Sequence, residues 1–306
     1  MTTTRHLISV DDLTDGDIHR LAARGVRFRE GTAAAGTPLA GHLAGIYFRK
    51  TSTRTRTAFT AGALRLGAQT IAYGPDDLQT NTGETVEDTA QVFGRMLDVL
   101  VARTAGDPAE LRAFAAGNRM SVINAMSAPE HPTQALTDLT TLLWHFGHVD
   151  GLRVLYVGEG NNTAAALALA LSRYRSAHLD LRTPPGYGLT GEVLARIDPK
   201  VVTERHDMKD LPEGVDVIYT TRWQTTGTSK PDANWRNIFA PFQVTADLWR
   251  GSPDAVFMHD LPAHRGEEVT AEVLDGPRSI AFDQAENKLH SAMAVLEWCR
   301  GADPAP

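Results

Sequence analysis

The chain has 306 residues, of which 42% are hydrophobic and 22% are charged, so it suits two globular domains of about 150 residues each. The net charge of −7 and the lack of a dominant basic face exclude a nucleic-acid partner, and the single cysteine, Cys299, excludes a disulfide framework or a cysteine-rich zinc site. No apolar run approaches the roughly 18 residues that a membrane span needs, and no signal peptide is visible, so we expect a cytoplasmic protein with no membrane partner.

The first half of the chain alternates apolar strands with helices. A helix is predicted over 14–29, because Ile18, Leu21 and Val26 share one face. The elements predicted after it cover 42–48, 58–66, 70–73, 84–96, 99–102, 108–116, 122–124 and 133–146. This alternation indicates a parallel sheet that is covered on both faces and binds ligands beyond the carboxyl ends of its strands.

The second half starts afresh near residue 150, with strands predicted at 152–157, 178–181, 201–202 and 215–219 and a last helix at 284–298. The stretch 158–163 is an incomplete dinucleotide fingerprint, because Thr163 replaces the third glycine. We therefore predict an α/β protein with two doubly wound parallel-sheet domains linked by helices. The first domain covers 1–148, with a helix of about 284–302 packing back on it, and the second covers 149–283.

The richest polar stretch is 48–57, FRKTSTRTRT, between a predicted strand and a predicted helix. Free N–H groups and the helix dipole favour an anion at such a helix start, and Arg54 offers a planar fork for two phosphate oxygens. The alternative is a solvated basic helix start that is capped by its serine and threonines.

Other polar residues mark further strand ends. Phe48, Arg103 and Asn124 each end a predicted strand, which places the Ser52 loop, Arg103 and His131 along one sheet edge. Arg103 is a second candidate anion ligand, with a surface charge as the alternative, and a loop-filling role is the alternative for His131. The stretch 259–268 is a loop dense in His, Asp, Arg and Glu.

The motifs in combination are specific and run in order through the whole chain. They are Ser52-Thr53-Arg54-Thr55-Arg56, Arg103, His131-Pro132-Thr133-Gln134-Ala135-Leu136, and Leu261-Pro262 with Gln284-Ala285-Glu286-Asn287. This set resembles the aspartate/ornithine carbamoyltransferase family, and 158–163, 243–244 and 264–269 are most similar to the ornithine enzymes. The resemblance implies carbamoyl transfer from carbamoyl phosphate to an amine, with phosphate as the leaving group and without a metal or organic cofactor.

The resemblance also implies roles for the first-half motifs. The phosphate would be held by Ser52, Thr53, Arg54, Thr55 and Arg103. The carbamoyl oxygen and amide would be held by His131, Gln134 and the Thr55 hydroxyl. The catalytic set would then be Arg54, Thr55, Arg103, His131 and Gln134. Asp260 joins this set from its own chemistry as a carboxylate and not from the resemblance.

The chain departs from the ornithine pattern where the second substrate binds. Ornithine enzymes carry Thr-Asp-x-Trp-x-Ser-Met-Gly, and the matching run here is 220–227, TTRWQTTG. Thr221 therefore replaces the aspartate that would hold the substrate's α-ammonium. The run is also similar to the Tyr-x-x-Arg-x-Gln of aspartate enzymes, which implies that Arg222 and Gln224 grip a carboxylate. Asn162 and Leu261 complete the expected second-substrate set.

Three further departures concern charge. Asp260 replaces the cysteine of His-Cys-Leu-Pro and would pair with an amine or accept its proton; the alternative is a pair with His264 or Arg265. Lys288 stands where ornithine enzymes have an arginine that reaches the carbamoyl group, and it offers a point charge without a fork. The loop 79–84 resembles one that aspartate enzymes lend to a neighbouring subunit. Thr82 takes the place of its lysine, and Gln79 or Asn81 is expected to reach across instead, in a homotrimer.

This hybrid pattern predicts carbamoyl transfer to a small amino acid or amino-carboxylate that is neither ornithine nor aspartate. A short diamino acid such as 2,3-diaminopropionate offers a carboxylate for Arg222 and an amine for Asp260. One alternative is an ornithine carbamoyltransferase with divergent recognition. Another is a binding protein that kept the fold and lost turnover. The reverse, phosphorolytic direction would use the same residues.

Overall fold

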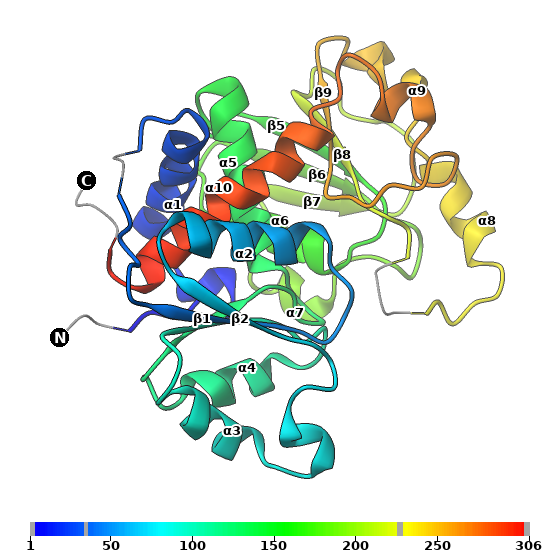
Figure 1. Ribbon diagram of the computed structural model, residues 1–306. Coiled ribbons are helices and arrows are strands. Elements are labelled where there is room, and N and C mark those ends of the chain that lie inside the picture. Colours follow the sequence, from blue (N-terminus) through cyan, green and yellow to red (C-terminus); the bar gives the residue numbers. More distant parts are fainter. Residues whose placement is uncertain (1–3, 34–35, 225–228, 303–306) are drawn as a thin grey trace. The chain divides into compact units, whose positions relative to one another are not determined.

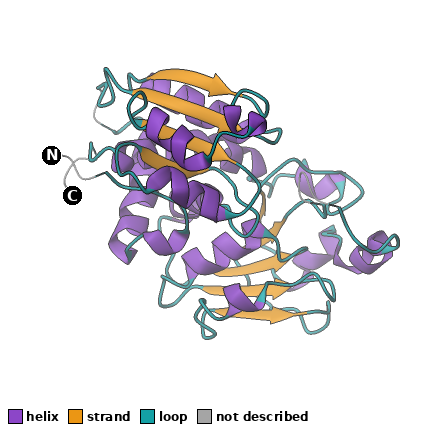
Figure 2. Cartoon of the chain, turned by 90° about the horizontal axis from the view of Figure 1, so that it is seen from below, coloured by secondary structure: helices purple, strands orange, loops and turns teal. Residues whose placement is uncertain are grey.

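The computed structural model describes residues 4–33, 36–224 and 229–302, and the chain divides into two compact units (Figure 1). Unit 1 comprises Met1–Thr141 and Asn287–Pro306, and unit 2 comprises Leu142–Glu286. Each unit is built on one sheet whose strands are all parallel (Figure 2). The predicted fold class, α/β with two parallel sheets, is confirmed.

The sheet of unit 1 has the strand order β2-β1-β3-β4. Its elements are α1 (Asp15–Arg29), β1 (Leu43–Phe48), α2 (Arg54–Arg65), β2 (Gln69–Tyr73), α3 (Val86–Phe93), β3 (Val99–Arg103), α4 (Pro108–Ala115), β4 (Ser121–Asn124), most of α5 (Pro132–Phe146) and most of α10 (Ala281–Cys299). Helix α2 lies on one side of β1 and β2, and α3 and α4 lie on the other (Figure 1). The register pairs Phe48 with Arg103 and Ala102 with Asn124, so three strands end at one edge.

Local signals explain where several of these elements begin. The Thr14 side chain accepts from the Asp17 N–H and Asp17 reciprocates, a capping box that starts α1 one residue after the predicted point. Glycine is required at position 25, because a Cβ there would lie 2.7 Å from Thr140 of α5. The region predicted as a loop before residue 84 contains a short 3-10 helix, Gln79–Thr82.

The sheet of unit 2 has the strand order β7-β6-β5-β8-β9. Its elements are β5 (Arg153–Val157), α6 (Asn162–Leu171), β6 (His178–Arg182), α7 (Gly191–Leu194), β7 (Val202–Arg205), β8 (Val217–Thr220), α8 (Trp235–Phe239), β9 (Val256–His259) and α9 (Ala271–Leu274), with 3-10 turns at Ala240–Phe242 and Ala246–Gly251. Strand order reverses at β5, so the loops that follow β5 and β8 flank the switch point, where such sheets bind ligands.

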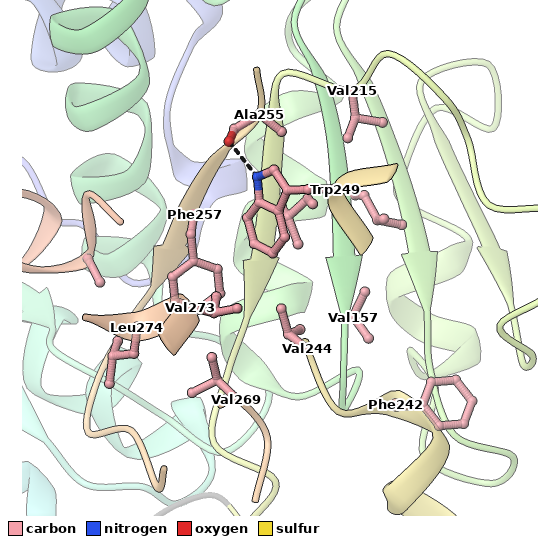
Figure 3. Close-up of a cluster of buried hydrophobic side chains, with 13 residues drawn as sticks. Val157, Val215, Phe242, Val244, Trp249, Ala255, Phe257, Val269, Val273 and Leu274 are labelled. Carbon is pink, nitrogen blue, oxygen red and sulfur yellow. Dashed lines mark hydrogen bonds between the residues drawn. The ribbon is translucent and has the colours of Figure 1, made fainter. Parts of the chain in front are cut away.

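The core of unit 2 covers β5, β8 and β9 and gathers aliphatic and aromatic side chains from the segments after them (Figure 3). Trp249 is 8% exposed and satisfies its indole N–H by donating to the Ala255 carbonyl at 2.7 Å. Phe257 of β9 and Val244 are fully buried in the same cluster. This packing fixes the carboxyl ends of β8 and β9, which carry the candidate second-substrate residues.

Candidate active site

The start of helix α2 is open to a ligand. Thr53 occupies the N-cap position but makes no side-chain hydrogen bond to the first turn, and no acidic residue lies in that turn. The alternative interpretation, in which a hydroxyl side chain caps this helix, is therefore not observed at Thr53. Arg56 points away, because it donates to the Tyr73 carbonyl at 3.3 Å and lies over the Phe48 ring. The N–H groups of a first helical turn and the helix dipole favour an anion at such a position.

Two buried side chains lie beyond the neighbouring strand ends of unit 1. Arg103, the last residue of β3, is 8% exposed, and His131, directly before α5, is 5% exposed. The Thr133 hydroxyl lies 3.2 Å from His131 Nδ1. Burial, and then the charges of Lys288 and Arg103, lower the pKa of His131 well below its ordinary value. The imidazole is therefore neutral near pH 7 and offers one N–H and one lone pair.

Gln134, in the first turn of α5, sits in a buried chain of polar groups. The Lys288 ammonium donates to Gln134 Oε1, and Gln134 Nε2 donates to Asp138 Oδ1 at 2.7 Å. All three side chains are more than nine-tenths buried. Lys288 and Thr55 also line the same small cavity. Unit 1 thus collects cationic and neutral donors suited to a phosphate and an adjoining carbonyl.

A carboxylate marks the corresponding edge of unit 2. The register pairs Thr220 with His259, so the next residues, Thr221 and Asp260, emerge side by side from β8 and β9. The Thr221 hydroxyl donates to Asp260 Oδ1 at 3.0 Å, and the Thr163 hydroxyl donates to Asp260 Oδ2 at 2.9 Å. Each carboxylate oxygen of Asp260 therefore has one neutral donor.

No lysine or arginine of the described residues forms an ion pair with Asp260. In the described part of the chain its charged-type neighbour is His259 Nδ1 at 3.5 Å, and that nitrogen accepts a hydrogen bond from the Leu261 N–H at 2.8 Å. Arg265 pairs instead with Asp275 at 2.5 Å, and His264 lies 3.7 Å from Glu267. The alternative in which Asp260 pairs with His264 or Arg265 is therefore not seen.

Two of the other second-substrate candidates, Arg222 and Gln224, follow Thr221 in the sequence. Arg222 is half-buried, and its guanidinium makes no hydrogen bond or ion pair with another described residue. Trp223 next to it is buried against Trp235 and Phe239, and Gln224 is half-buried. Residues 225–227, which align with Ser-Met-Gly, lie outside the described residues. Asn162 opens α6 and is 7% exposed.

The loop proposed to reach a neighbouring subunit is bonded to itself in this chain. The Thr82 hydroxyl donates to the Gln79 side chain at 2.8 Å and to its carbonyl at 2.9 Å, and Asn81 donates to the Pro75 carbonyl. Among residues 4–33, 36–224 and 229–302 no group of three or more His, Cys, Asp or Glu side chains could hold a metal ion. None of the helices in those ranges is long and apolar enough to cross a membrane.

Several contacts of the site were not predicted. Asp138 lies four residues after Gln134 on the same helix face, a spacing that would have revealed it. Thr163 was considered only as a missing glycine of a cofactor fingerprint, whereas its hydroxyl holds Asp260. No sequence signal indicated that the Lys288 ammonium would bond Gln134, because the two residues lie 154 positions apart.

Two parallel α/β units, one with a candidate oxyanion site at a helix start and one with a carboxylate at its switch point, are consistent with a group-transfer enzyme that binds two substrates. Residues 5–143 match the family described as aspartate/ornithine carbamoyltransferase, carbamoyl-P binding domain, and residues 150–299 match its Asp/Orn binding domain. The chain therefore belongs to the aspartate/ornithine carbamoyltransferase family, and it is a carbamoyltransferase.

Relatives and solved structures agree with this assignment. The chain is 39% identical over 297 residues to an ornithine carbamoyltransferase of Pseudomonas syringae pv. tomato, covering 96% of both proteins. The structure is similar to ornithine carbamoyltransferase from Pyrococcus furiosus, with a TM-score of 0.90, 35% identity and coverage of 99% of this chain and 100% of that one. The enzyme from Thermus thermophilus gives a TM-score of 0.86 at 32% identity, covering 96% of this chain and 98% of that chain.

Proposed function

We propose that the enzyme transfers the carbamoyl group of carbamoyl phosphate to an amine of a short diamino acid, with 2,3-diaminopropionate as the candidate. Unit 1 binds the donor and unit 2 binds the acceptor. The observation that carries the acceptor assignment is the Asp260 carboxylate, which two threonine hydroxyls hold and no lysine or arginine of the described residues neutralises. A substrate ammonium completes it.

The donor site follows from the polar groups of unit 1. Ser52, Thr53, Arg54, Thr55 and Arg103 bind the phosphate, and each charge-assisted hydrogen bond contributes about 1.5–3 kcal/mol. The neutral His131 imidazole donates its N–H to the carbamoyl oxygen, together with the Thr55 hydroxyl and Gln134. These donors gain strength as negative charge builds on that oxygen in the tetrahedral intermediate.

The reaction then needs only an amine in its neutral form. The nitrogen lone pair attacks the carbamoyl carbon, the bond from that carbon to the phosphate oxygen breaks, and phosphate leaves. The amine proton goes to the departing phosphate. For a diamino acid, one nitrogen stays protonated against Asp260 while the other reacts, and the substrate carboxylate pairs with Arg222.

Ornithine is the second candidate acceptor, because the relatives at 35–39% identity carry the name ornithine carbamoyltransferase. Against it stands Thr221, where ornithine enzymes hold the α-ammonium with an aspartate. The carboxylate of this chain comes from the next strand, as Asp260. The non-catalytic alternative is disfavoured by the nearly complete set of expected carbamoyl-phosphate ligands. The homotrimer, the contribution of Gln79 and Thr82 to a neighbouring site and the cytoplasmic location remain predictions.

The test is phosphate release by the purified enzyme with carbamoyl phosphate and single amines. The panel comprises 2,3-diaminopropionate, 2,4-diaminobutyrate, ornithine, aspartate and alanine, and mass spectrometry identifies the ureido product. We expect turnover with the short diamino acids and little with ornithine or alanine. If ornithine is the only amine of the panel that is carbamoylated, it replaces the proposed acceptor. If none of the amines causes phosphate release, the result favours a binding protein.

A further inference from the structure

Lys288 is a buried cation whose ammonium contacts another side chain of the candidate site. It lies on α10, is 7% exposed, and directs its ammonium to Gln134 Oε1. Its charge is felt by His131, and it lines a small cavity together with Thr55. Lys288 therefore sits among the residues that the proposed function assigns to the carbamoyl group, and the inference below rests on that function.

The partners of Gln134 determine how its amide is oriented. A lysine ammonium can only donate hydrogen bonds, and an ionised carboxylate can only accept them. With Lys288 on one side and Asp138 on the other, the amide oxygen must face Lys288 and the nitrogen must face Asp138. The flipped amide would place two donors against each other and two acceptors against each other, in a site where unmet polar groups are costly.

We infer that Lys288 is a positioning residue that fixes the Gln134 amide and acts on the carbamoyl group through it. The second N–H of Gln134 and the second lone pair of its oxygen then keep constant positions. A carbamoyl group needs such a pair, because its oxygen accepts and its NH₂ donates. Lys288 thus contributes to binding of the carbamoyl group without an arginine fork, because it orients Gln134 and does not itself contact the substrate.

The experiment compares carbamoyl phosphate with inorganic phosphate as titrants in calorimetry. Lys288→Met should weaken carbamoyl phosphate by about tenfold or more, the effect of one charged hydrogen bond, and leave phosphate within about twofold. In a Gln134→Ala background the same substitution should change carbamoyl phosphate binding by less than about threefold, because coupled residues are not additive. Lys288→Arg, still a donor-only cation, should stay within a few-fold of the wild type.

Lys230→Met is the matched control, since Lys230 is also buried, with 3% of its side chain exposed, and pairs with Glu159 in unit 2. It should leave carbamoyl phosphate binding unchanged. An equal loss from Lys288→Met in the presence and absence of Gln134 would overturn the inference, as would an equal loss for both titrants. Failure of the wild-type enzyme to bind carbamoyl phosphate would overturn the proposed function together with the inference.

Discussion

Replacing Asp260 with asparagine tests the acceptor site with little change in shape. The side chain is 14% exposed and accepts from Thr221 and Thr163 at 3.0 and 2.9 Å. Asparagine keeps one acceptor oxygen, and its NH₂ group can donate to the other threonine, whose hydroxyl then accepts. The stability of the fold should therefore change by no more than about 1 kcal/mol.

The effect on catalysis should be much larger. A unit charge about 4 Å from a substrate ammonium interacts by about 4 kcal/mol at an effective dielectric constant near 20. After exchange with water, a hydrogen bond to a charged group retains about 1.5–3 kcal/mol, which corresponds to about a 10- to 100-fold change. We expect kcat/KM for the diamino acid to fall by that factor.

The assay is initial-rate phosphate release at varied acceptor, paired with calorimetric titration of carbamoyl phosphate. Donor affinity should not change, because Asp260 belongs to unit 2 and the donor ligands belong to unit 1. Asp275→Asn is the matched control, because that carboxylate pairs with Arg265 on the surface, where solvent screens the ion pair. If Asp260→Asn keeps kcat/KM within about twofold, or weakens the donor equally, the reasoning is refuted.

Three further outcomes follow from the two sites and the core. Arg222→Ala should raise the acceptor KM and leave carbamoyl phosphate binding unchanged, and Arg54→Ala should do the reverse. The measurement is steady-state kinetics with both substrates varied. A substitution that affects both substrates equally would contradict separate sites. Because the folded-state pKa of His131 is depressed, the unfolded chain binds the extra proton first as pH falls below about 6.5. The stability advantage of the wild type over His131→Asn, from urea unfolding at pH 5–7, should shrink by up to about 1.4 kcal/mol per pH unit, and a constant difference would contradict burial of a neutral imidazole. Arg24 Nε lies 2.7 Å from the buried Glu297 carboxylate. Arg24→Met should lower the free energy of unfolding in denaturant by about 3–5 kcal/mol, because it leaves that carboxylate buried without its partner. Replacing both residues with apolar ones should recover much of that loss.

The residues of the candidate donor half could be named from the sequence because their signals are local. Ser52 to Thr55 are contiguous, and the apolar strand before them and the helix after them fix where their N–H groups point. Arg103 could be added because parallel strands end at one edge, and the register of Phe48 with Arg103 has that geometry. The rule that parallel strands end at the same sheet edge therefore predicted which residues of unit 1 lie near each other, although they are far apart in the sequence.

The acceptor half depends on details that periodicity does not encode. Thr221 and Asp260 meet because β8 and β9 are neighbours in exact register, and β9 was not recognised as a strand from its four residues. Helices α7 to α9 are four or five residues long, too short to show a helical period. The pairing of Lys288 with Gln134 depends on how α10 packs against α5, which no local pattern specifies.

The most direct test of the proposed function is a competition between two acceptors. Wild-type enzyme is given carbamoyl phosphate with equal concentrations of 2,3-diaminopropionate and ornithine, and the two ureido products are quantified by mass spectrometry at low conversion. The product ratio equals the ratio of the two kcat/KM values. We expect carbamoylated diaminopropionate to predominate by about tenfold or more, the effect of one charged contact. Predominance of carbamoylated ornithine would contradict the role assigned to Asp260.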